Sequence, residues 1–515
     1  MKIIIYILSF QFLGIALIAQ SASEVLKYSL ARPFGTARAT GCIEAMGALG
    51  GDFTAIGINP AGIGLFRKSD FYISTYANFD EQQSTLSNGA NSTFSNSTYS
   101  KTKDSYGITG LGFVFTSSPI ASKWSNVNFA INLMKTANFN KSYYFKGKSV
   151  GSITDRFLEL ALDPNKSGLI GLDPNKLDAF EARLAYETGA LFHSDSAKTM
   201  YSTDLLRHQG YLLPKEQILK TSGGLYDLSF GLGGNYDETW AFGASIDIPF
   251  GSFRSESDYL ESEAKKNEVL PFKNLDFQEV LHTSINGIGG KLGIIFKPSQ
   301  FLRVGLSWQT PTYLWMRDQY HTSLTYSYND QTQDTSFTSY SPDGEFTYRL
   351  TLPMRTVLSA AYIAKHGFVS ADIDFLNVSH AKYNLTADSD QAGDYVLQQE
   401  VNNDIKKQYK SAIQYRLGGE LALGFFRLRA GLEFLQQVYS NSDKYDMGYS
   451  FGFGFRRDRF YIDLGYKHTE VEQAYAPYLT GNSDFDGNGT VDAPTPLVNQ
   501  KSIQQLIQVT FGFKL

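Results

Sequence analysis

Long segments of the sequence alternate between large apolar side chains and small or polar ones. Between Met447 and Phe455 every odd position is apolar or aromatic, and every even position is Gly or Ser. The segments Phe426 to Phe434 and Phe460 to Lys467 follow the same period of two. Successive side chains of a β-strand point to opposite faces, so each segment predicts a strand with one apolar and one polar face. Strands of ten residues or more, with charge beside Gly on the polar face, favour a transmembrane barrel over a soluble sandwich.

The strand pattern repeats along most of the chain and predicts an all-β, 14-stranded antiparallel transmembrane β-barrel. The expected strands lie at about 70–84, 104–117, 125–146, 222–234, 238–256, 279–297, 300–326, 345–363, 367–386, 406–424, 425–440, 445–456, 458–476 and 500–515. An even count returns both chain ends to the periplasmic side. Short connections alternate with long ones, including 147–221, which we expect to be a partly helical outer loop. This alternation is typical of bacterial outer-membrane barrels, with short periplasmic turns and long outer loops.

Composition agrees with a membrane barrel and excludes several other classes of protein. Charged residues are 19% and aromatic residues 14%, which fits sheets with one face in lipid. The net charge of −5 and the lack of a basic stripe predict no nucleic-acid partner. Cys42 is the single cysteine, so no disulfide can form within the chain. The sequence contains neither H-E-x-x-H nor G-x-S-x-G, and we expect no enzymatic activity.

The two ends of the chain carry export and insertion features. Residues 1–19 have one charge, Lys2, followed by an apolar run, which predicts a signal peptide cut after Ala19; the alternative is a membrane anchor. No later stretch offers about 20 consecutive apolar residues. The last strand, IQQLIQVTFGFKL, resembles the aromatic-rich final strand that the barrel assembly machinery reads, although Leu515 stands where a Phe is usual. We expect a multi-pass monomer in contact with membrane lipid.

Residues 20–68 precede the first strand and carry the most specific resemblance. The run AMGALGGDFTAIGINPAGIG resembles the hatch of the FadL/TodX family of long-chain fatty acid and hydrocarbon transporters. The residues that match the family motif are Asp52, Asn59, Pro60, Ala61 and Gly62. Residues 285–308 resemble a Gly-rich family hairpin, and 350–353, Leu-Thr-Leu-Pro, resemble the family's L-x-L-P.

The resemblance implies a barrel plugged by this N-terminal hatch in the outer membrane of a Gram-negative cell. It implies passive capture of long-chain fatty acids or aromatic hydrocarbons at the outer loops, binding in the lumen, and lateral release through a gap beside the third strand. No Pro or Gly between Asn126 and Phe145 forces a bulge there, so the residues do not locate the gap. The alternatives are a water-filled porin, an outer-membrane enzyme and an adhesin.

One outer loop has the residue spacing of a calcium-binding loop. Oxygen-bearing side chains stand at loop positions 1, 3, 5 and 9, with Gly at position 6. The candidate ligands are Asp484, Asp486, Asn488, Thr490 and Asp492. Thr495 replaces the usual bidentate acid at position 12, and a plain Asx-Gly turn is the alternative. No other cofactor is expected.

Charged residues on the polar strand faces are expected to point into the lumen. One interpretation is a self-neutralising ladder that fixes the barrel and the hatch. The other is that one or two cations hold the carboxylate of a fatty acid. The candidates for that role are Lys291, Arg303, Arg355 and Arg416.

Overall fold

The computed structural model describes residues 24–87, 95–164, 166, 169–208, 210–265, 269, 271–329, 333–385, 392–481, 483–485, 491 and 494–515. The strands are β1 (Asp70–Leu86), β2 (Tyr99–Ser117), β3 (Trp124–Asn138), β4 (Lys141–Ser149), β5 (Phe192–His193), β6 (Tyr201–Ser202), β7 (Leu213–Tyr236), β8 (Trp240–Ser262), β9 (Phe272–Phe296), β10 (Leu302–Gln309), β11 (Thr312–Asn329), β12 (Asp334–Tyr340), β13 (Gly344–Leu352), β14 (Arg355–Ala364), β15 (Gly367–Asn377), β16 (Lys382–Asn384), β17 (Ser411–Leu423), β18 (Phe426–Gln436), β19 (Tyr445–Arg456), β20 (Phe460–Tyr475) and β21 (Val498–Lys514). The helices are α1 (Glu24–Ser29), α2 (Ala37–Gly41), α3 (Ala55–Ile58), α4 (Ile153–Ala161), α5 (Ala182–Thr188) and α6 (Ala392–Gln408), with 3-10 turns η1 (Pro60–Leu65), η2 (Pro174–Lys176), η3 (Asp204–His208) and η4 (Val378–His380).

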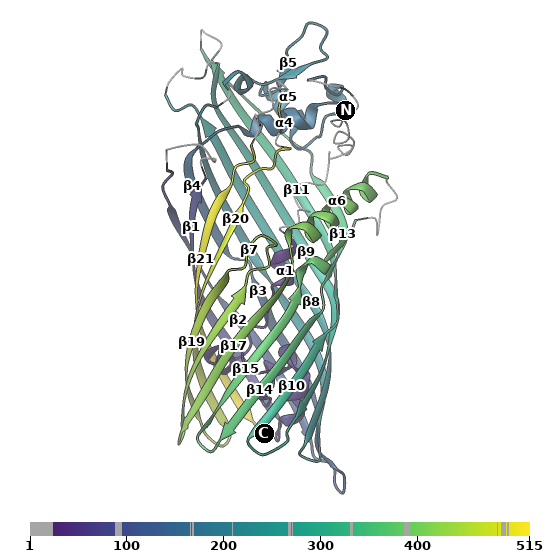
Figure 1. The fold of residues 1–515 in the computed structure, drawn as a ribbon, viewed down its shortest axis with the longest axis vertical. Coiled ribbons are helices and arrows are strands. Elements are labelled where there is room, and N and C mark those ends of the chain that lie inside the picture. The colour runs from purple at the N-terminus through teal and green to yellow at the C-terminus, as the bar shows by residue number, and fades with distance from the viewer. Residues whose placement is uncertain are drawn as a thin grey trace, which may run out of the picture.

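The large sheet closes on itself because β21, the last strand, pairs along its whole length with β1 (Figure 1). Every pairing in it is antiparallel. Several segments are parts of one strand with a break: β3 with β4, β10 with β11, β15 with β16, and β12 with β13 and β14. Counted this way, the described residues form a closed barrel of fourteen strands, and the predicted fold class and strand count are confirmed.

Two of the breaks occur at proline. Pro311 separates β10 from β11, and Pro353 separates β13 from β14. Proline has no N–H to donate to a ladder, so the strand bends or stops there. The predicted strands 300–326 and 345–363 are therefore each divided, and they still occupy one position in the barrel.

The outer end of the barrel is taller than a membrane requires. Strands β7, β8 and β9 have 24, 23 and 25 residues, whereas about 9–11 residues span a bilayer. Helices α4 and α5 pack against this extension in an apolar cluster with Phe157 and Phe277 (Figure 1). The region 387–405, which connects the predicted strands 367–386 and 406–424, largely belongs to α6. Leu397, Val401 and Ile405 of α6 are buried against the segment that contains Tyr383.

Large apolar side chains cover the outer faces of the strands. Phe451, Leu432 and Leu292 are 56%, 47% and 52% exposed. Their sequence neighbours on the opposite face, such as Ser450 and Glu433, are buried inside the barrel. This distribution is typical of a barrel surrounded by lipid.

Among the described helices, none combines the length and the apolar character needed to cross a bilayer.

The N-terminal segment, residues 24–68, contacts the inner faces of strands on opposite sides of the barrel (Figure 1). Helix α2 packs near β18, β19, β20 and β21, whereas η1 packs near β3, β7, β8 and β9. Residues 35–64 are almost entirely buried. The segment therefore occupies much of the cross-section of the lumen between these strands.

Candidate functional site: the lumen and a break in the wall

The Asn-Pro-Ala-Gly motif forms a hydrogen-bonded corner against the wall. Asn59 is 1% exposed and its side-chain amide donates to the carbonyl of Gly47 at 2.7 Å and to that of Ile294, in β9, at 3.4 Å. Its Oδ1 accepts from the Ala61 N–H at 3.1 Å, so Asn59 caps η1 with Pro60 in the first position. A Cβ at Gly293 would lie 2.0 Å from Asn59 Oδ1. The corner can approach β9 this closely because the wall residue there is glycine.

Asp52, the other predicted hatch residue, also has a local structural role. Its carboxylate accepts from Thr36 Oγ1 at 2.9 Å and from the Thr54 N–H at 2.9 Å. Arg38 lies 3.9 Å away and also pairs with Glu420 of β17. Asp52 therefore connects two parts of the N-terminal segment to each other and, through Arg38, to the wall.

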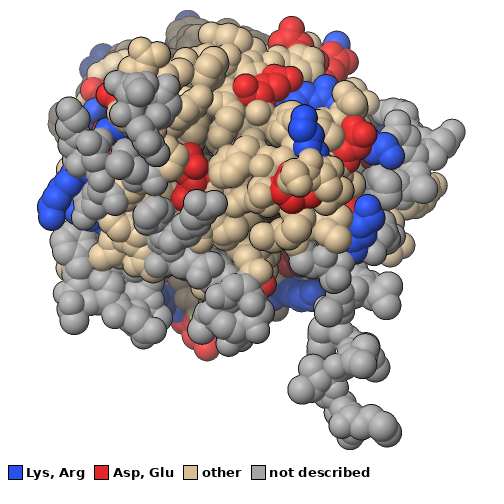
Figure 2. Space-filling model, turned by 90° about the horizontal axis from the view of Figure 1, so that it is seen from above, with Lys and Arg blue, Asp and Glu red and all other residues tan. Residues whose placement is uncertain are grey.

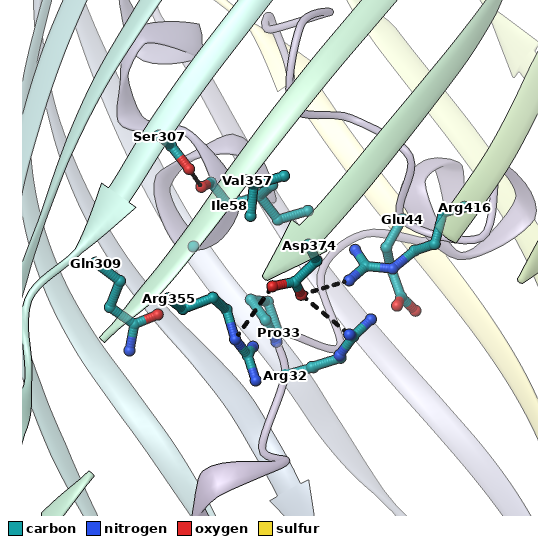
Figure 3. Close-up of a pocket in the computed structure, with 11 residues that line it drawn as sticks. Arg32, Pro33, Glu44, Ile58, Ser307, Gln309, Arg355, Val357, Asp374 and Arg416 are labelled. Atoms are coloured by element: carbon teal, nitrogen blue, oxygen red, sulfur yellow. Dashed lines mark hydrogen bonds and ion pairs between the residues drawn. The ribbon is translucent and has the colours of Figure 1, made fainter. Parts of the chain in front are cut away.

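Three arginines converge on one carboxylate close to the end of α1 (Figure 3). Asp374 of β15 lies 3.0 Å from Arg32 of the N-terminal segment, 3.0 Å from Arg416 and 3.6 Å from Arg355. Arg355 also donates to the carbonyl of Ser29, the last residue of α1, and to that of Ala31. The group surrounds a polar cavity of about 20 Å³, enough for about one water molecule. This arrangement holds the N-terminal segment to the wall.

The four cations predicted to bind a substrate carboxylate all contact protein acceptors. Arg355 and Arg416 lie together at Asp374. Lys291 pairs with Asp247 at 2.7 Å, and Arg303 donates to the carbonyl of Leu49. The four therefore do not form one site, and three of them contact carboxylates. Their contacts fit the alternative interpretation, a ladder that fixes the barrel and the N-terminal segment.

An apolar cluster of buried side chains packs around α1, and we call the space that α1 fills within this cluster the chamber. Val25 and Tyr28 of α1 belong to a buried cluster that includes Phe139, Phe253, Ile285, Met316, Tyr348 and Tyr383. Tyr28 meets Phe139 edge-on at 5.9 Å between ring centroids, and Lys27 Nζ lies 3.5 Å from the centre of the Phe253 ring. Two acidic groups, Glu24 of α1 and Asp318, lie at this chamber, and the Asp318 carboxylate accepts from Thr283 Oγ1 at 2.6 Å. Rings and aliphatic side chains on one connected surface are suited to an apolar ligand.

The wall has a break next to this chamber. Ser117 of β2 pairs with Val127 of β3 at one end of the ladder between these strands. At its other end Gly110 pairs with Met134, and the ladder stops there. Beyond that point β2 stays paired with β1 as far as Tyr99, and β4 pairs with β7. Among the described residues no ladder joins β2 to β4. Asn138 Nδ2 bridges the two sides, donating to Ser105 Oγ at 2.9 Å.

The N-terminal segment replaces the missing partner at the start of this break. The Arg32 N–H donates to the carbonyl of Thr136 and the Phe34 N–H to that of Lys135, both at 2.9 Å. The register of β3 against β7 shifts between Lys135 and Ala137. Residues 32–34 thus contact both the arginine group and the edge of the wall break.

Sequence reasoning did not locate this break or the lysine beside it, Lys135. The signal lies outside the third strand, in the pair Gly223-Gly224 of β7, the strand that β3 and β4 share as a partner. Gly223 has φ +111°, a conformation that favours glycine, and its carbonyl accepts from the Phe139 N–H. The irregularity is therefore encoded in the neighbouring strand.

Two predictions fall mainly on residues outside the described parts of the chain. They are the signal peptide, residues 1–19, and the calcium loop, of which Asp484 is described while Asp486, Asn488, Thr490 and Asp492 are not. The start of that outer loop is attached to α4, because Glu159 accepts from the Gly481 N–H at 2.7 Å. Thr480 and Thr495 hydrogen-bond to each other across the loop.

Comparison with known proteins places this geometry in a known fold. No family model and no curated protein matches the sequence. A Pseudomonas aeruginosa FadL homologue of known crystal structure is similar, with a TM-score of 0.54 and 12% identity over 94% of this chain and 99% of that one. The toluene transporters TodX of Pseudomonas putida (TM-score 0.45, 11% identity, 93% and 98% covered) and TbuX of Ralstonia pickettii (0.45, 12%, 93% and 98%) also align. The chain therefore has the fold of the FadL-type barrel.

Proposed function

We propose that this protein carries hydrophobic small molecules across the outer membrane of a Gram-negative cell without an energy source. The observation that carries the proposal is the connection of an apolar lumenal chamber to a break in the wall. Phe139 belongs to the chamber and directly follows β3, where the pairing with β2 has ended. A ligand in the chamber is therefore next to a possible exit into the bilayer.

The N-terminal segment would act as a hatch that controls this route. It fills the chamber with α1, is held at Asp374 through Arg32, and hydrogen-bonds to β3 at the break. An apolar molecule gains about 25 cal/mol for each Å² that leaves water, so it enters the chamber spontaneously when it displaces α1. The bilayer is an equally apolar destination, and lateral exit needs no further driving force.

A water-filled porin is the second candidate, and no observation favours it. Ion pairs and the buried N-terminal segment occupy the lumen, and side chains of the described residues pack over the outer end, with acidic and basic groups interspersed (Figure 2). The fold of the Pseudomonas aeruginosa FadL homologue supports hydrophobic transport.

We further propose that the chain is a monomer inserted by the barrel assembly machinery, since the end of the chain places Phe511, Phe513 and Leu515 outward at the seam with β1.

A disulfide across the wall break tests the proposed route. Ser105→Cys with Asn138→Cys, in a Cys42→Ala background, joins residues whose side chains now form a hydrogen bond. We expect oxidation to abolish uptake of labelled hydrophobic molecules and a reductant to restore it. Phe115→Cys with Phe129→Cys is the matched control, since these residues pair in the continuous part of the same two strands. Equal uptake by the oxidised and reduced Ser105/Asn138 variant would reject lateral exit at this break.

A further inference from the structure

Helix α6 covers the low side of the outer rim. Strands β14, β15, β17, β18 and β19 have 10 to 13 residues, about half the length of β7, β8 and β9. Near the outer ends of these short strands the outward side chains are still apolar, such as Phe375 and Phe434, both 38% exposed. Helix α6 crosses the wall directly above them and close to α1 (Figure 1). It therefore lies where the apolar belt of the barrel ends.

The buried face of α6 closes one side of the chamber. Leu397, Val401 and Ile405, four residues apart along the helix, belong to the same apolar cluster as Val25 and Tyr28 of α1. The buried side chains of α4 and α5 pack in a different cluster, at the tall side of the barrel. Displacement of α6 would therefore open the chamber directly.

Two amide side chains hold α6 to β16. Asn402 Oδ1 accepts from the Tyr383 N–H at 2.8 Å, and its Nδ2 donates to the Tyr383 carbonyl at 2.9 Å. One turn earlier, the side chain of Gln398 accepts from the Leu385 N–H at 2.8 Å. These are neutral hydrogen bonds to the edge of a short strand, and a side chain can release them without breaking a ladder.

The C-terminal end of α6 is attached differently, through the backbone. Tyr409, directly after the helix, forms an antiparallel bridge with Tyr439, between β18 and β19. The Gln408 carbonyl accepts from the Ser440 N–H at 2.8 Å. This end is thus fixed to the barrel, whereas the part of the helix around Gln398 and Asn402 is held by side chains, so α6 can swing about its last turn.

The other covering of the outer end, which α4 and α5 form and which we call the cap, is held by buried charged groups. Glu261 of β8 is 0% exposed and accepts from the Ile153 N–H, at the start of α4, at 3.0 Å. Within the cap, Arg156 pairs with Glu181. Breaking buried charged contacts costs several times more than breaking neutral hydrogen bonds. Of the two coverings, α6 is therefore the one that separates more easily.

We propose that α6 is the gate of an entrance through which hydrophobic molecules reach the chamber from the outer rim. The proposal rests on the transport function proposed above and adds the point of entry. An apolar molecule at the rim stays beside apolar surface, whereas the outer end of the barrel carries interspersed charged groups (Figure 2).

The position of α6 around the barrel gives this entrance a direction. The wall break lies between the second and third of the fourteen strands, and α6 connects the ninth to the tenth. Seven strands therefore separate the two in either direction, and the chamber lies between them. A molecule that enters beneath α6 crosses the whole lumen before it reaches the break.

A reversible cross-link between α6 and β16 tests the entrance. Asn402→Cys with Asn384→Cys, in a Cys42→Ala background, places one thiol on α6 and one beside its contact at Tyr383. A short bis-methanethiosulfonate reagent joins the two thiols. Association of tritiated oleyl alcohol, an uncharged probe, with the full-length barrel in nonionic detergent is followed by scintillation proximity. Cross-linking should slow association about 10-fold or more, and a reductant should restore the rate.

Loosening α6 should have the opposite effect. Gln398→Ala with Asn402→Ala removes three hydrogen bonds, and the association rate should rise about 10- to 100-fold. The dissociation constant should change less than about twofold, because the closed barrel loses the same bonds with and without ligand. Asn403→Ala, at the exposed neighbouring position, is the matched control. A changed affinity with an unchanged rate would show that the two amides only support the chamber, and would reject the gate.

A second cross-link separates the gate from the cap and from the transport function. Ser339→Cys with Glu187→Cys joins β12 to α5 of the cap, at residues that hydrogen-bond to each other, and should leave association unchanged. Slower association in that variant alone would place the entrance under the cap and overturn the gate. If the wild-type barrel binds the probe and the α6 cross-link does not slow it, the gate is wrong while transport stands. If the wild-type barrel does not bind the probe, the proposed function fails, and the entrance with it.

Discussion

Removing the side chain of Asn59 should loosen the N-terminal segment without unfolding the barrel. The perturbation is Asn59→Ala, alone and with Pro60→Ala. Asn59 makes three hydrogen bonds, to the Gly47 carbonyl, the Ile294 carbonyl and the Ala61 N–H. None of them belongs to a strand ladder, so the wall itself loses no pairing.

The expected size of the effect follows from these three bonds. A hydrogen bond contributes about 0.5–1.5 kcal/mol net, and the 3.4 Å contact with Ile294 belongs at the low end. The total is about 2–3 kcal/mol, which raises the population of released segments about 30- to 150-fold. A released segment no longer supports α1 in the chamber or residues 32–34 at the wall break, and uptake should fall.

Hydrogen exchange and uptake together test this reasoning. Amide exchange of peptides covering residues 45–66 should accelerate by about the same 30- to 150-fold. Uptake of labelled oleate, normalised to surface protein, should fall while the heat-modifiable barrel persists. Asn274→Ala, at an exposed position of β9, is the matched control. Unchanged exchange and uptake at equal surface level would show that the corner has no part in transport, and loss of the protein from the membrane would show a role in folding instead.

Three further predictions concern charge and metal binding. Asp374→Asn leaves three arginines without their shared anion and should weaken the attachment of the N-terminal segment by about 3–5 kcal/mol, measured as faster proteolysis of that segment. Burial raises the pKa of Asp155 and Asp178, in the outer loop, to about 7. The folded loop therefore binds more protons than the unfolded loop between about pH 4 and 7, so it should resist protease better near pH 5 than near pH 8, a difference that Asn at both positions should remove. Millimolar Ca²⁺ should order the outer loop, and Asp486→Ala should abolish the heat of binding in titration calorimetry; identical heats for the two proteins would reject the calcium site.

The architecture could be predicted because its signal is local. Alternation in segments such as Met447–Phe455 depends on the two faces of each strand, and the structure confirms fourteen strands. The prolines that divide strands, Pro311 and Pro353, were visible in the sequence, and their effect depends only on their missing N–H. Helix α6 was missed because its apolar residues Leu397, Val401 and Ile405 are few among polar neighbours.

The candidate site could be predicted only in part because its contacts join distant segments. The resemblance selected Asn59, but its partner Ile294 lies 235 positions away in the sequence. The predicted lumenal cations could not be assigned partners, since period two places Lys291 inside the barrel without showing that Asp247 accompanies it.

The contacts of Lys291 and Lys135 also explain why charge in the lumen does not by itself indicate a porin. In a water-filled lumen an unpaired lysine is hydrated, so the lack of a carboxylate partner costs little free energy. Here the N-terminal segment contacts the carbonyl of Lys135, and the ammonium is buried with no carboxylate of the described residues within ion-pair distance. A paired group such as Lys291 stabilises the closed state, because its charge is already neutralised. Lys135 instead donates to the Tyr76 hydroxyl and to the amide oxygen of Asn138. In a lumen that the N-terminal segment fills, these charges are thus held by protein partners rather than by water.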